Sequence, residues 1–116
     1  MTDRPSRPAL AGLLGPGAHY VGSLVFQGKV RVDGTLNGSL RTDDLLEVGP
    51  DGRIDGEVEV AQALIAGTID GVLRAKERVT LLETAVIRGR VITPWLDMRL
   101  GARVKGEVVV ERDGKP

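Results

Sequence analysis

Three carboxylates stand close together at Asp43, Asp44 and Glu47, and such a group could act as a general acid and base. The other parts of a catalytic site are missing around them. The single histidine is His19, there is no cysteine, and no serine stands in a G-x-S-x-G sequence. Runs of charged residues most often form a solvated loop between strands. We therefore predict a polar connection here, with no catalytic residue, no metal site and no cofactor.

The composition excludes several other classes of protein. The 116 residues include 16 Lys and Arg and 16 Asp and Glu, and this zero net charge argues against a nucleic-acid binder. No apolar run approaches the ~20 residues of a membrane span. Because the only aromatic residues are Tyr20, Phe26 and Trp95, the core must be aliphatic. We expect one domain without a small-molecule substrate, with His19 on the surface and Trp95 packed at a corner beside Pro94.

One seven-residue pattern (small, x, apolar, x, Gly, x, apolar) recurs six times along the chain. Typical copies are GTLNGSL, GRIDGEV, GTIDGVL and AVIRGRV. The central glycines lie 15 to 18 residues apart, and we interpret them as structural repeat glycines: Gly22, Gly38, Gly56, Gly71, Gly89 and Gly106. Such a period indicates a repeat architecture rather than a globule with unrelated segments.

Apolar and charged residues alternate within each copy, as in Ile54, Asp55, Gly56, Glu57 and Val58. This period of two is typical of a half-buried strand. The pattern predicts an all-β solenoid of about six rungs, each with about three short strands, stacked roughly 4.8 Å apart. The glycine has inward parity, so we place it where the rung bends and a side chain would crowd the interior, or where φ is positive.

The stacking makes local predictions, because equivalent residues of successive rungs become neighbours. Asp70 should lie beside Arg88, and Arg90 beside Glu107. Exposed ion pairs of this kind contribute little to stability.

The two chain ends differ from the repeats. Residues 1–16 contain three prolines and two glycines, so we predict a flexible arm there, a β-helix over 17–110 and a short polar tail over 111–116. The arm places basic residues before apolar ones, an order that fits either a peripheral membrane anchor or a plain flexible tail. The residues concerned are Arg4, Arg7, Leu10, Leu13 and Leu14.

Both ends of the predicted rod lack a capping helix, and open strand edges invite association. We predict an N-terminal contact surface of Tyr20, Val21, Leu24, Val25 and Phe26, and a C-terminal one of Val104, Val108 and Val110. Contacts between like ends would give a non-polar filament, whereas head-to-tail contacts would give a polar one. The residues alone do not choose between these two.

The repeated units VDGTLNGSL, RIDGEVEV, GTIDGVL and VIRGRV resemble those of the bactofilins, the bacterial polymer-forming cytoskeletal proteins. The resemblance covers Ala18 to about Val110. It implies a right-handed β-helix that polymerises without nucleotide into non-polar filaments, with its C-terminal contact centred on Val104 and Val108. Many members carry phenylalanine at the position of Val104, so this chain departs from the pattern there.

The resemblance also implies a place in the cell. The protein would lie in the cytoplasm, peripheral on the inner face of the cytoplasmic membrane, attached through Leu10, Leu13 and Leu14. It would serve as a scaffold for cell shape, the cell wall or polarity, with proteins of those systems and other copies of itself as partners.

Two alternatives remain open from the residues. One is a β-helical adaptor that forms a discrete oligomer and binds a partner protein on its outer face. The other is an enzyme related to the left-handed β-helix acyltransferases, although those use a strict hexapeptide period and supply histidines.

Overall fold

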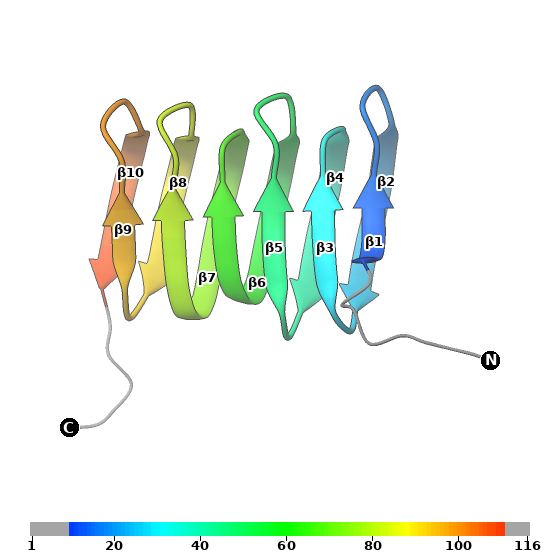
Figure 1. Ribbon diagram of the computed structural model, residues 1–116, viewed down its shortest axis with the longest axis horizontal. Coiled ribbons are helices and arrows are strands. Elements are labelled where there is room, and N and C mark those ends of the chain that lie inside the picture. The colour runs from blue at the N-terminus through cyan, green and yellow to red at the C-terminus, as the bar shows by residue number, and fades with distance from the viewer. Residues whose placement is uncertain (1–9, 111–116) are drawn as a thin grey trace.

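The computed structural model describes residues 10–110, which form a solenoid built entirely of β-strands (Figure 1). All the strand pairings in this range are parallel. The strands are β1 Leu10–Leu14, β2 His19–Phe26, β3 Lys29–Val32, β4 Thr35–Thr42, β5 Leu45–Val48, β6 Arg53–Ile65, β7 Thr68–Leu81, β8 Val86–Thr93, β9 Leu96–Met98 and β10 Arg103–Val110.

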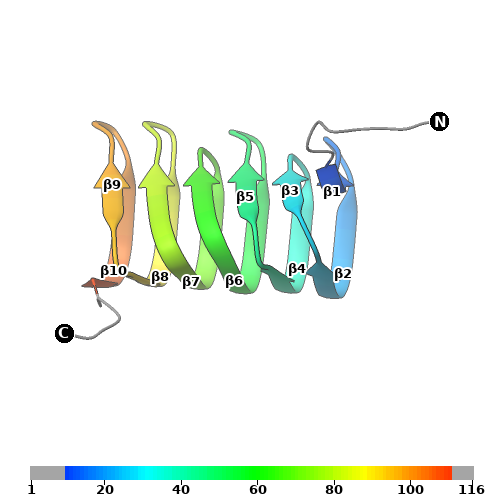
Figure 2. The same ribbon diagram turned by 60° about the horizontal axis from the view of Figure 1, so that its bottom comes forward.

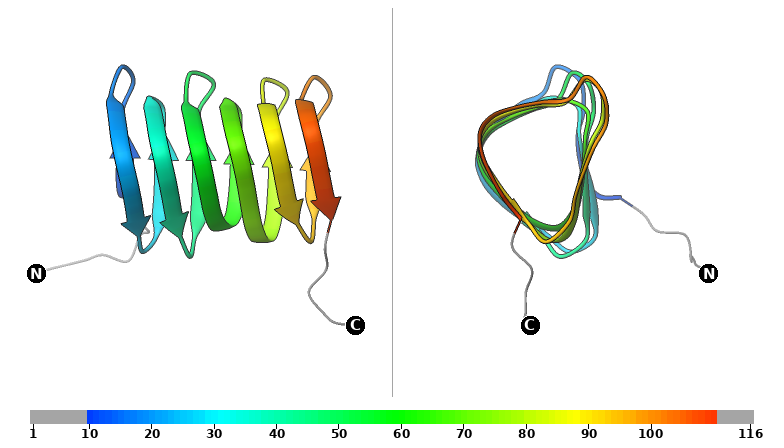
Figure 3. Two further views of the ribbon diagram at one scale, coloured as in Figure 1. Left: turned by 180° about the vertical axis from the view of Figure 1, so that it is seen from behind. Right: turned by 90° about the vertical axis from the view of Figure 1, so that its left-hand side faces the viewer.

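Each turn of the solenoid consists of a short segment followed by an eight-residue segment. β1 and β2 make the first turn, and β9 and β10 make the sixth. The long strands β6 and β7 each combine an eight-residue segment with the short segment of the next turn. Seen along its axis, the solenoid has three sides, as the sequence predicts (Figure 3). Because only two hydrogen-bonded segments form each turn, the longer one supplies two of the sides.

The solenoid is right-handed, as the family resemblance implies. In Figure 1 the chain rises along the front strands, crosses over the top and descends behind, while it advances from β1 towards β9. Rotation and advance in this sense define a right-handed coil. The hand does not follow from the repeat period, which is the same for either coil.

The core is an aliphatic column inside the coil, as expected. Ile54, Ile69 and Ile87 pair in register on successive turns and are each completely buried. Full burial of such a side chain contributes roughly 1.5–3 kcal/mol. The residues between them, such as Asp55 and Arg88, face outward at partly or fully exposed positions. The predicted alternation of inward and outward residues is therefore confirmed.

The repeat glycines form a ladder along the rod. All six pair in register from turn to turn, with φ between 127° and 144°. They are the only described strand residues with this left-handed φ, so we place the bend of the eight-residue segment at them. A Cβ on Gly71 would overlap the carbonyl oxygen of Gly56 on the preceding turn. The crowding therefore comes from the neighbouring backbone, not from the interior as the parity had suggested.

The predicted boundary of the flexible arm is wrong. Residues Leu10–Leu14 form β1, which pairs with β3 and continues the stack. Leu14 is only 8 % exposed, and its carbonyl oxygen accepts a hydrogen bond from the Asp33 amide at 2.7 Å. β1 covers the open side of β3. The free energy gained by this pairing outweighs the unfavourable effect of Gly12 on strand formation. Arg4, Arg7 and the tail 111–116 lie outside the described residues.

Candidate functional site: the two open ends of the rod

The N-terminal end is formed by β1 and β2, and the C-terminal end by β9 and β10 (Figure 2). Within the described chain, each of these strands has a pairing partner on one side only. Their other edges present unpaired backbone N–H and C=O groups, which is a ready template for another strand. Both ends of the rod are thus open to association.

Three N-terminal side chains have the inward parity of the core but lie on its outermost turn. Tyr20 pairs in register with Leu36, and Leu24 with Leu40, whose side chains are buried by the turns around them. In the first turn no residue within 10–110 covers them on their outer side, so Tyr20 is 43 % exposed and Leu24 is partly exposed. Phe26 closes the interior, because a Cβ on Gly12 of β1 would come within 2.6 Å of its ring.

Val21 and Val25 belong to the outer wall instead. They pair with Asn37 and Arg41, which face outward, and each valine is 73 % exposed. They extend the apolar surface of the first turn around its side, where the next three turns carry polar residues. Residues 10–28 contain no charged side chain, so the part of this end that the structure describes is uncharged.

The C-terminal end carries a second apolar surface. Val104 and Val108 pair with Ile87 and Val91, both fully buried, but in the part of the chain that the structure describes no further turn covers the last one. Val108 is therefore 38 % exposed and Val110 is 56 % exposed, whereas Val104 is half-buried against the core.

Two residues of this end were not predicted from the sequence. Met98 pairs with the buried Leu81 and is 45 % exposed, and Leu100, in the loop after β9, is 95 % exposed. Met98 could have been predicted from the segment WLDMRL. Leu96 and Met98 are two residues apart, so on a strand they face the same, inward side. Leu100 lies beyond the strand, where parity carries no information.

The C-terminal end also differs from the N-terminal end in charge. Arg99, Arg103 and Lys105 lie on the last turn at exposed positions. Glu107 binds Arg90 of the preceding turn, with 2.9 Å between its carboxylate oxygen and the guanidinium Nη2. With the exposed Asp97 of β9, this end has an apolar centre and a charged rim, whereas residues 10–28 at the other end carry no charge.

The carboxylates that could have formed an acid–base site do not converge. Asp43 and Asp44 lie at exposed positions between β4 and β5. Glu47 faces outward on β5 and pairs with Lys29 at 3.4 Å and Arg31 at 3.3 Å. No group of three potential metal-binding side chains occurs within residues 10–110.

Arg31 is the centre of this polar cluster. Its Nε donates to Asp33 at 2.8 Å. This hydrogen bond raises the pKa of the Arg31 guanidinium, against the lowering effect of desolvation. Because arginine is already charged throughout the ordinary pH range, this shift does not change the charge of Arg31 there.

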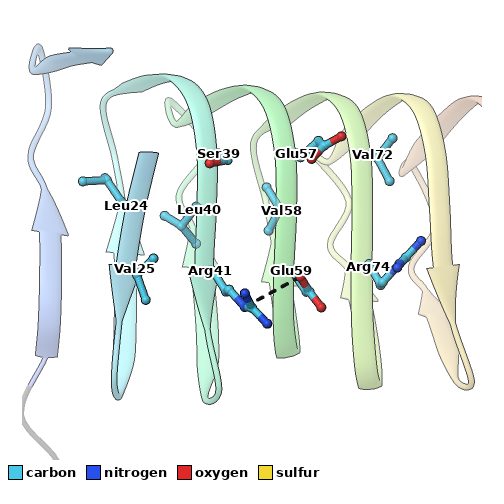
Figure 4. A pocket seen from close by; sticks show the side chains of 10 residues that line it. All are labelled: Leu24, Val25, Ser39, Leu40, Arg41, Glu57, Val58, Glu59, Val72 and Arg74. Carbon is cyan, nitrogen blue, oxygen red and sulfur yellow. Dashed lines mark ion pairs between the residues drawn. The ribbon is translucent and has the colours of Figure 1, made fainter. Parts of the chain in front are cut away.

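The outer wall of β2, β4, β6 and β7 holds an open groove of about 400 Å³. Figure 4 shows charged side chains along it, with Arg41 paired to Glu59 at 3.7 Å. Its lining alternates in charge and contains Glu57 and Arg74 but neither a histidine nor a cysteine.

His19 is exposed at the start of β2, as predicted. The prediction for Trp95 as a packing residue is wrong, because its side chain is 55 % exposed. The guanidinium of Arg78 lies 6.0 Å from the centre of its ring, a distance typical of a cation–π contact. Pro94 prevents strand pairing at this position, and the ring turns outward onto the neighbouring turn.

Two of the predicted membrane residues, Leu13 and Leu14, do not face the same surface. Leu14 belongs to the core, whereas Leu13 is 61 % exposed on the outer side of β1. Leu10 begins the same strand. Residues 10–110 contain no helix that is long and apolar enough to cross a membrane.

Comparisons with known proteins agree with this architecture. The family model described as "Bactofilin: Polymer-forming cytoskeletal" matches residues 12–109. The chain is similar to the crystal structure of a phenylalanine-to-arginine mutant of bactofilin from Thermus thermophilus, with 36 % sequence identity and a TM-score of 0.69. That match covers 78 % of this chain and 100 % of the other. The search of curated proteins found no match.

Proposed function

The chain belongs to the bactofilin family of polymer-forming cytoskeletal proteins, and on that premise we propose that it stacks end to end into filaments without nucleotide. The family is structural rather than enzymatic, and we assign no catalytic activity to this chain. The observation that carries the proposal is the pair of apolar ends, which no other part of residues 10–110 covers. Val108 and Tyr20 occupy core positions of the repeat yet remain exposed until another copy covers them.

Stacking completes contacts that the repeat already makes internally. The second turn covers one side of Tyr20 and Leu24, and a turn added from another copy would cover the other side. It would also pair with the open edge of β2. Burial of apolar area and new backbone hydrogen bonds drive such an association. The exposed apolar side chains and the unpaired strand edges are already present in the folded chain. No nucleotide is therefore required to create the contact surface.

We propose that like ends meet, as in the non-polar filament that the family resemblance implies. The uncharged first turn would then meet a second uncharged first turn, and the last turn a second last turn. Each contact is isologous, and two different isologous contacts alternate along an open filament.

We further propose that the filament lies on the inner face of the cytoplasmic membrane and acts there as a scaffold for cell shape, the cell wall or polarity. Leu13, exposed at 61 %, and the residues before β1 would provide the attachment. Leu14 is excluded from this role by its burial. One copy binds weakly, but many copies on one filament would bind strongly by avidity.

Charged substitutions at the ends test the assembly. Phe26→Arg should block the N-terminal contact, and Val104→Arg the C-terminal one, because each places a charge in an apolar interface. Each variant should yield dimers at most, and the double variant single rods, by analytical ultracentrifugation. Gln62→Arg, on the exposed outer wall, is the matched control and should assemble as the wild type does.

Circular dichroism must show unchanged β content in each variant. Filaments of wild-type length from both single variants would refute stacking at these residues. Discrete small particles from the wild type would favour the adaptor alternative.

A further inference from the structure

The outer wall beside the glycine ladder carries charges in an ordered sequence. In each turn, two outward residues flank the repeat glycine. Turn three carries two carboxylates, turn four one carboxylate and one apolar side chain, and turn five two guanidiniums. The pairs in that order are Asp55 and Glu57, Asp70 and Val72, and Arg88 and Arg90, in register across β6, β7 and β8. Figure 4 shows Glu57 and Val72 on neighbouring turns of this wall.

These groups retain unused capacity for ion pairs. Among residues 10–110, neither Asp55 nor Glu57 makes a salt bridge. Arg88 reaches Asp70 only at 4.0 Å. Arg90 directs its Nε and Nη2 to Glu107, which leaves its Nη1 without a partner in the described chain. Two carboxylates without partners and two guanidiniums with spare donors therefore stand two turns apart.

We propose that this wall is a lateral contact between two copies of the chain that lie antiparallel. A two-fold axis through the fourth turn sets Asp55 against Arg88 of the other copy and Glu57 against Arg90 of the other copy. The axis generates the same two pairs again, so four ion pairs form. Val72 lies on the axis and meets its own equivalent.

The charge order selects this orientation. In a parallel face-to-face pair, the residues before the glycine meet the residues after it. Asp55 then faces Glu57 and Arg88 faces Arg90, so the charged pairs of turns three and five are all repulsive, and only Lys105 and Glu107 of turn six attract each other. In the antiparallel pair like charges meet on the axis, at Asp70, which is already bound by Arg53 of its own chain at 3.6 Å, and at Arg74 further along β7.

The neighbouring turns do not oppose the contact. Turn two carries the uncharged Asn37 and Ser39 around its glycine. It meets turn six of the other copy, where Lys105 and Glu107 balance each other.

This inference rests on the proposed function, because filaments multiply a contact that is weak in one pair of rods. Exposed ion pairs contribute little singly, but a filament repeats them many times along its length. Rods that alternate in orientation always offer an antiparallel neighbour. The side-by-side association of filaments should therefore be strong at low ionic strength and be lost at high salt.

The absence of native cysteine allows a direct test with the full chain. Val72→Cys places a thiol on the axis, and a short thiol-specific cross-linker should join two copies. Ser39→Cys is the matched control, on the same column but two turns away. Its equivalent in the other copy would lie about 19 Å along the axis, given turns about 4.8 Å apart, beyond the reach of that linker.

We expect cross-linked dimers of the Val72→Cys chain in 50 mM salt and a several-fold loss in 500 mM salt. Adding Asp55→Arg with Glu57→Arg should remove the product, and also adding Arg88→Asp with Arg90→Glu should restore it. No product from Val72→Cys, equal product from Ser39→Cys, or no response to charge reversal would each overturn the proposal.

Pelleting of filaments, measured in parallel, tests the proposed function separately. Filaments without the cross-link would refute only the lateral contact. The cross-link without filaments would refute only the end-to-end assembly.

Discussion

At the scale of single residues, the repeat glycines are required by backbone proximity as well as by φ. A Cβ on Gly71 would overlap the carbonyl oxygen of Gly56, whereas a Cβ on Gly22 would meet nothing closer than the Tyr20 ring at 3.4 Å. Gly22 shares the positive φ but has no preceding turn. Comparing an alanine substitution at these two positions therefore separates the free-energy cost of the steric clash from that of the positive φ.

Gly71→Ala should destabilise the rod more than Gly22→Ala does. The conformational strain, common to both, costs about 1–3 kcal/mol, and only Gly71→Ala adds a clash with backbone that cannot move alone. Urea denaturation followed by circular dichroism measures both variants. Equal losses of unfolding free energy would show that φ, and not the neighbouring turn, selects glycine.

The glycine ladder could be predicted from the sequence because its period is visible in six copies. The ion pairs between Asp70 and Arg88 and between Arg90 and Glu107 followed from the same register and are confirmed. The outward turn of Trp95 could not be predicted, since it depends on where Pro94 ends the strand pairing.

At the scale of elements, β1 is a strand that the sequence pattern does not predict. It has no copy of the repeat and contains a glycine, so nothing in the local sequence indicates a strand. It forms because β3 offers an open edge and Leu14 can cover the core. This pairing depends on the register between β1 and β3, which exists only once the turns have stacked.

The two neighbouring leucines of β1 should respond differently to a charge. Leu14→Asp should lower the free energy of unfolding by about 2–4 kcal/mol, because the side chain is buried. Leu13→Asp should leave stability within about 0.5 kcal/mol and reduce binding to anionic liposomes, because the side chain is exposed. Thermal denaturation and liposome co-sedimentation measure the two effects. Unchanged liposome binding by Leu13→Asp would remove Leu13 from the attachment.

A charge within a middle turn should unfold the rod. Ile69 is completely buried between Ile54 and Ile87, so Ile69→Asp should cost more than about 4 kcal/mol. Thr68→Asp, at the partly exposed neighbouring position, is the control and should remain folded. Cooperative unfolding of Ile69→Asp near the wild-type temperature would contradict the inward assignment.

At the scale of the whole molecule, the coil itself followed from the period of about 17 residues and the alternation within each copy. The aliphatic core and the two open ends followed as well. The hand of the coil came from the family resemblance, because a repeat period is compatible with either hand. The full extent of the C-terminal end, including Met98 and Leu100, required the last turn to be placed.

The ends of the rod differ in a way that affects assembly. The first turn has no charged residue, whereas the last carries Arg99, Arg103 and Lys105. Dimers of Val104→Arg, joined through first turns, should therefore keep their association constant between 50 mM and 500 mM salt within about threefold, because no charge lies at that contact. Sedimentation equilibrium measures it. A tenfold or larger loss at high salt would indicate an ionic contact instead.

Cryo-electron microscopy of the purified chain, without nucleotide, metal or lipid, tests end-to-end stacking most directly. Six turns at about 4.8 Å give a subunit length of about 29 Å. Alternating like-end contacts then predict filaments with a repeat of about 58 Å and strands perpendicular to the axis. A repeat of about 29 Å would contradict the non-polar arrangement. Discrete small particles at every protein concentration would contradict polymerisation itself.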